Sequence, residues 1–79
     1  MRPTRPFVAF AFDSTHSALD AEALLEDMGI DVVPIPAPPS VSAQCGIAMR
    51  VPQEQAPRAS KYLERGGIEV RAMVEFEDV

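Results

Sequence analysis

The residue best suited to covalent chemistry is Cys45, the single cysteine among 79 residues. A loop rich in proline and serine, residues 36–44, leads into it, and Gly46 and an apolar run at 47–51 follow. A lone thiol forms no intramolecular disulfide and completes no paired-cysteine metal site. Three uses remain for Cys45: a packed core residue, a reactive thiol, or one half of an intermolecular pair.

A second polar group lies at Ser14, Thr15 and His16, directly after an apolar run at 7–12. Ser14 and Thr15 are suitable N-caps for a following helix. Unpaired N–H groups at a helix start favour an anion, and therefore the thiolate form of a nearby cysteine. His16, the only histidine, is interpreted either as an exposed surface residue or as a partner of Cys45. Nothing in the sequence supplies a third group to orient such a pair.

Hydrophobic periodicity predicts the order strand, helix, strand, strand, helix, strand. Gly29 is a natural end for the first helix, and Pro34 places the second strand at a sheet edge because it removes a backbone donor. Residues in the last strand alternate between apolar and polar. The predicted strands are 7–12, 30–35, 45–51 and 68–76, and the predicted helices are 15–28 and 53–65.

This order predicts an α+β, ferredoxin-like βαββαβ sandwich: a four-stranded antiparallel sheet in the order 4-1-3-2 with both helices on one face. The chain forms a single domain, 1–79, with residues 1–5 as a flexible N-terminus. In this topology Cys45 lies near the start of the first helix, and Cys45, Ile47, Met49 and Val51 face the helices. Ala9, Ala11, Gly46 and Ala48 leave a flat opposite face, through which, or through an edge, we expect a homodimer.

Composition excludes several partners and sites. A net charge of −5 argues against nucleic acid and anionic membranes. No run of 18 apolar residues spans a membrane and no signal peptide is recognisable, so we expect a cytoplasmic protein. Because there is no Gly-rich phosphate loop and no metal-ligand cluster, we expect neither a cofactor nor a metal, apart from covalent sulfur or selenium on Cys45.

The chain resembles the selenium/sulfur (Se/S) carrier protein-like family, a small bacterial family once classed as a domain of unknown function. The resemblance covers about residues 7–75 and lies in 12–25, 29–30, 35–38 and 42–49. Its most specific part is Pro-x-Pro followed by Ser-x-x-Cys-Gly, which ends at Cys45 and Gly46. Where the family pattern has arginine after the second proline, this chain has Pro39. The resemblance implies that Cys45 holds sulfur or selenium as a persulfide or perselenide, with donor and acceptor proteins as partners. We expect the binding residues around the Cys45 thiol to be Ser14, Thr15, His16, Ser42 and Gly46.

Two functions stay open on the sequence. In the first, the protein is a carrier without turnover of its own, and Cys45 is an exposed thiol of lowered pKa. In the second, it is a non-catalytic small-ligand-binding or regulatory protein-interaction module, and Cys45 is a buried structural residue. No acid–base constellation supports an enzyme, and the fold alone does not decide between the two.

Overall fold

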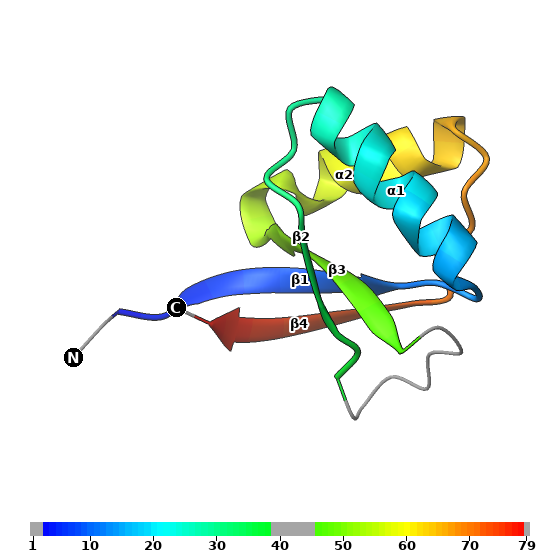
Figure 1. Ribbon diagram of the computed structural model, residues 1–79. Helices are drawn as coiled ribbons and strands as arrows, with labels where there is room; N and C mark the ends of the chain where they lie inside the picture. The colour runs from blue at the N-terminus through cyan, green and yellow to red at the C-terminus, as the bar shows by residue number, and fades with distance from the viewer. Residues whose placement is uncertain (1–2, 39–45, 79) are drawn as a thin grey trace.

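Four strands form one antiparallel sheet that carries both helices on the same side (Figure 1). The computed structural model describes residues 3–38 and 46–78. The strand order is β2-β3-β1-β4, which is the predicted order read in reverse, so the predicted sheet is confirmed. The elements are β1 (Arg5–Ala11), α1 (Thr15–Asp27), β2 (Val33–Pro36), β3 (Ile47–Pro52), the 3-10 helix η1 (Gln53–Gln55), α2 (Ala56–Arg65) and β4 (Ala72–Asp78).

The main core lies between the sheet and the helices. Side chains alternate along a strand, so Val8, Phe10 and Phe12 share one face of the sheet. The register pairs Val8 with Val51 and Phe10 with Met49, which places β3 side chains on that face too. These residues form one buried cluster with residues of both helices: Ala18, Ala21 and Leu25 of α1, and Ala56, Ala59 and Leu63 of α2. The predicted helix-facing set is therefore confirmed for Ile47, Met49 and Val51.

β1 is buried on both of its faces. Phe7, Ala9 and Ala11 point away from the helices, yet each is at most 4% exposed. Ala48 of β3 and Phe76 of β4 lie on the same side, because they pair with Ala11 and Phe7. The two rings of Phe7 and Phe76 stand 6.1 Å apart. A strand without a polar face must be central, as the apolar run at 7–12 indicated.

Glycines in the left-handed region end both helices. Gly29 has a φ of 78° and Gly67 a φ of 73°, values that a side chain with a Cβ disfavours. After α1, the Ile30 N–H donates to the Leu25 carbonyl at 2.9 Å, and after α2 the Ile68 N–H donates to the Leu63 carbonyl at the same distance. Both are Schellman closures that bring an apolar residue back to the core. The predicted role of Gly29 is confirmed.

The predicted start of the last strand, residue 68, is wrong. Ile68 closes α2 and packs with Val70 against the helix-side core, so β4 begins only at Ala72. The Arg71 N–H donates to the Ala11 carbonyl at 2.8 Å, one residue before the regular ladder. Apart from Met73, the sequence alternates between apolar and polar residues throughout 68–76. Ile68 and Val70, however, belong to the connection between α2 and β4 and not to the strand. Beyond that point Ala72, Val74 and Phe76 face away from the helices, whereas Met73 lies on the helix side.

The three other strand starts also differ from prediction. β1 begins at Arg5 rather than at residue 7. The second strand was predicted from Ile30, but Ile30 belongs to the closure of α1 and β2 begins at Val33. β3 was predicted from Cys45, but it begins at Ile47 because Gly46 has a φ of 74°, outside the extended region. Pro34 lies in an edge strand, as predicted. Within the described residues, no helix is long and apolar enough to cross a membrane.

Candidate functional site

Cys45 and Ser42, two of the predicted site residues, lie outside the described residues, so their predicted placement near α1 stays a prediction. The structure does describe Ala37 and Gly46, which lie on either side of this segment in the chain. The Ala37 N–H donates to the Gly46 carbonyl at 3.0 Å, which continues the β2–β3 ladder by one pair. The chain therefore leaves β2 and enters β3 from a fixed hydrogen-bonded pair.

Gly46 is the described residue next to the thiol. It is exposed, and a Cβ added to it would meet no atom within 4 Å. Its φ of 74° nevertheless makes glycine the favoured residue there. The register joins Ala48 to Ala11, so Gly46 lies at the end of the sheet where β1 gives way to Asp13 and Ser14. From the same topology, the sequence predicts that Cys45, next to Gly46, lies near the start of the first helix.

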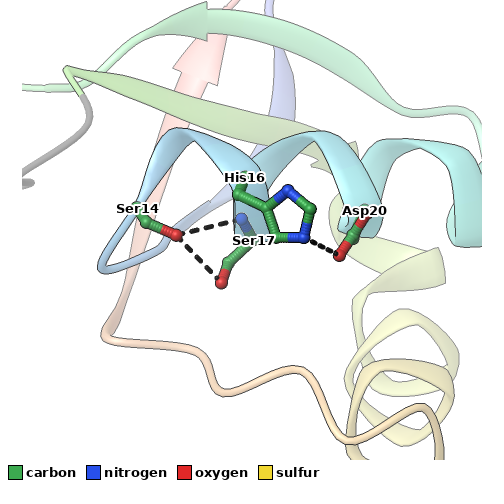
Figure 2. A network of polar contacts seen from close by, with 4 residues as sticks. All are labelled: Ser14, His16, Ser17 and Asp20. Atoms are coloured by element: carbon green, nitrogen blue, oxygen red, sulfur yellow. Dashed lines mark hydrogen bonds and ion pairs between the residues drawn. The ribbon is translucent and has the colours of Figure 1, made fainter.

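Ser14 caps the first turn of α1 (Figure 2). Its Oγ accepts a hydrogen bond from the Ser17 N–H at 3.1 Å and lies 3.1 Å from the Ser17 hydroxyl. This is the N-cap role predicted for it. Thr15 is the first residue of the helix and is exposed. The first turn of α1 contains no acidic residue, so the positive end of the helix dipole is not neutralised there.

His16 lies along the helix surface. Its Nε2 is 3.3 Å from Asp20 Oδ2, one turn later, and its side chain is 87% exposed. Figure 2 shows the imidazole beside Asp20. This geometry matches the interpretation of His16 as an exposed surface residue. The alternative, a pairing of His16 with Cys45, stays a prediction because Cys45 lies outside the described residues.

Sequence reasoning missed Arg71 at this end of the sheet. Its Nη1 is 2.8 Å from Asp13 Oδ1, in a pair that joins residues 58 positions apart. The pair brings a positive charge to the start of α1 and offsets the negative charge of Asp13, both partners being substantially exposed. No sequence signal identified it, because the pairing depends on the β1–β4 register.

The described residues contain no candidate metal centre. Among the described residues, no group of three or more histidine, cysteine, aspartate or glutamate side chains could hold a metal ion. The arrangement at the Gly46 end of the sheet thus offers a helix N-terminus, a capping hydroxyl and an arginine–aspartate pair. Such groups can stabilise an anion nearby.

Comparison with known proteins gives one match. The model of the family described as "Putative Se/S carrier protein-like" matches residues 8–75, which is most of the chain and agrees with the extent of the resemblance found in the sequence. No curated protein and no solved structure matches. On the strength of the family model, this chain belongs to the Se/S carrier protein-like family.

Proposed function

We propose that this protein carries one sulfur or selenium atom on Cys45, as a persulfide or perselenide, from a donor protein to an acceptor protein. The observation that supports the proposal most is the family match over residues 8–75, a segment in which Cys45 is the only thiol. We assign five residues to the surroundings of Cys45: Ser14, Thr15, His16, Ser42 and Gly46. Ser14 and Thr15 contribute because they form the start of α1.

The transfer needs no external oxidant or reductant. The Cys45 thiolate attacks the outer sulfur of a persulfide on the donor. One S–S bond forms on Cys45 while the S–S bond of the donor breaks, and the donor leaves as a thiolate. In the second step a nucleophile of the acceptor attacks the outer atom, and Cys45 leaves as a thiolate. The selenium case exchanges an S–Se bond in the same way.

The described electrostatics favour a thiolate at this end of the sheet. A helix N-terminus contributes about 0.3–1 kcal/mol to a nearby anion. The first turn of α1 lacks acidic residues, and Arg71 offsets Asp13. These local charges oppose the net charge of −5, which is spread over the molecule and screened by salt.

We therefore expect Cys45 to react with iodoacetamide in the folded protein with a midpoint below pH 8.5, about the pKa of an ordinary thiol. A lowered pKa increases the thiolate fraction at neutral pH, and the thiolate is the reactive form. The measurement is the alkylation rate against pH, with the urea-unfolded protein as the reference. A midpoint above about 8.5, or no reaction before unfolding, would favour the alternative, a ligand-binding or regulatory module with a structural Cys45.

We also propose that two copies pack through the sheet face opposite the helices. On that face Val74 and Phe76 of β4 are half-buried apolar side chains that a second copy can cover. Phe7, Ala9, Ala11 and Ala48 of β1 and β3 lie on the same face but are already buried within the chain, at most 4% exposed. The register places Arg50 and Asp78 on the same face, and these two form an ion pair at 3.0 Å. Glu75 and Glu77 point to the helix side, so self-packing brings few like charges together. A small chain gains from such burial.

The self-association is tested with two matched lysine substitutions in β4. Val74→Lys places a charge on the proposed interface, and we expect the dimer dissociation constant to rise by about tenfold or more, roughly 1.4 kcal/mol. Met73→Lys makes the same kind of change on the opposite face of the strand and should leave the dimer intact. Sedimentation equilibrium measures both. A monomeric wild-type protein at high micromolar concentration, or equal effects of the two variants, contradicts this interface.

A further inference from the structure

The two edges of the sheet differ in their free backbone groups. Ala37 and Gly46 are a hydrogen-bonded pair, and such pairs recur at every second residue of an antiparallel ladder. Val33 and Ile35 therefore direct their backbone groups towards β3, whereas residues 34 and 36 direct theirs away from the sheet. Both outward positions are proline, Pro34 and Pro36. The outer edge of β2 thus offers no N–H donor at either of these positions, and strand addition there is blocked.

The outer edge of β4 carries no further strand among residues 3–38 and 46–78. The same alternation, followed through β3 and β1, directs the backbone groups of Ala72, Val74 and Phe76 towards β1. Those of Met73, Glu75 and Glu77 point outwards, and no described strand lies beyond β4. β4 is seven residues long and contains no proline. It presents a regular row of donors and acceptors to an incoming strand.

A groove accompanies this edge on the helix side. It consists of two adjoining hollows of about 310 and 380 Å³ that share Ser60 of α2. The larger lies between α2 and β4, and the smaller lies between α2 and residues 67–70, which lead into β4. Apolar side chains line it from both sides, including Val8, Ala56 and Met73 in the larger hollow and Ile68 and Val70 in the smaller. Met73, the second residue of β4, is 53% exposed, which is unusual for a large apolar side chain in a strand. The groove can therefore receive long side chains from a segment bound along β4, whose methylene stems lie against these apolar residues.

The groove is negatively charged, which favours a basic partner segment. Glu64 and Glu69 line one hollow and Glu75 the other, and Glu77 lies next along the edge. Among the described residues, no lysine or arginine lines either hollow. A second copy of β4 is a poor partner, because antiparallel pairing centred on Glu75 would set two Glu75 carboxylates opposite each other. A basic strand places its cations against these carboxylates instead.

We propose that β4 is a docking edge for an extended, basic segment of a partner protein, which adds to the sheet as a fifth strand and places alternate side chains in the groove between α2 and β4. Main-chain hydrogen bonds to Met73, Glu75 and Glu77 bind the partner segment. The groove and its carboxylates determine which partner sequences bind. The surface includes none of the residues assigned to the thiol site, so it stands independently of the carrier function.

The test uses a short peptide of alternating lysine and valine, and its charge-reversed counterpart of alternating glutamate and valine. In amide NMR titrations up to millimolar peptide, we expect the basic peptide to bind and to slow hydrogen exchange at Met73, Glu75 and Glu77. The acidic peptide should bind at least about tenfold more weakly. Failure of the basic peptide to bind, equal binding of both peptides, or perturbation confined to β2 or to the opposite sheet face would overturn the proposal.

Two variants separate backbone from charge. Met73→Pro removes one outward N–H and leaves the β1–β4 ladder complete, so it should fold and bind the basic peptide about tenfold more weakly or worse. Glu75→Lys should weaken binding similarly, whereas Glu26→Lys, the same charge change on α1 outside both hollows, should not. If Met73→Pro does not fold, Glu75→Lys against Glu26→Lys decides. Unchanged binding in the folded β4 variants contradicts docking at this edge.

Discussion

Phe10→Ala is expected to lower the free energy of unfolding by about 3–5 kcal/mol. Phe10 is fully buried, lies on the central strand β1, and packs in the cluster formed by the sheet and both helices. Its removal leaves a cavity that β1 cannot close, because β3 and β4 hold it on both sides. At roughly 0.05–0.15 kcal/mol per residue, a chain of 79 residues has a total of only about 4–12 kcal/mol.

Urea denaturation followed by circular dichroism, at one fixed protein concentration, measures the loss. The control is Leu19→Ala on the outer side of α1, where the leucine is 52% exposed. This variant should stay within about 0.5 kcal/mol of the wild type. A loss below about 1 kcal/mol in Phe10→Ala, or equal losses in the two variants, would show that the core does not centre on β1.

Cys45→Ser is expected to abolish both loading and transfer of sulfur or selenium. The chain has no second cysteine to replace it, and a serine hydroxyl forms neither a persulfide nor a perselenide. The measurement is the passage of isotopically labelled sulfur from a donor persulfide protein through this protein to an acceptor thiol. Asp27→Asn, a change at the exposed end of α1, serves as the control and should transfer at the wild-type rate. Transfer through Cys45→Ser at the wild-type rate would exclude the thiol as the carrier group.

Most of the architecture could be predicted because local signals agreed with the global fold. The apolar run at 7–12 indicated a strand buried on both sides, Pro34 indicated an edge, and Gly29 indicated a helix end; the structure confirms all three. Strand boundaries were less predictable, because the apolar residues at 68 and 70 serve the closure of α2 rather than the sheet. Alternation also does not reveal which face of a strand meets the helices, since that depends on long-range register.

The candidate site was predictable only in part. The capping role of Ser14 followed from a local signal, a hydroxyl before a helix. Gly46 was predicted within the third strand, whereas its φ of 74° places it before the strand. The Arg71–Asp13 pair did not, because it forms across the β1–β4 register between residues far apart in the chain. The sequence likewise did not identify the available edge of β4 or the proline-blocked edge of β2. Both depend on which residues direct their backbone N–H and C=O groups away from the sheet, and the strand register determines this. The placement of Cys45 itself stays a prediction.

Intact-mass analysis tests the central claim most directly. The folded wild-type protein is incubated with a cysteine or selenocysteine lyase and its amino-acid substrate, and its mass is compared with that of Cys45→Ser treated in the same way. The carrier function predicts a gain of one sulfur or selenium atom in the wild type, removable by a thiol reductant, and no gain in the variant. An unmodified wild-type protein, or the same gain in Cys45→Ser, would contradict it.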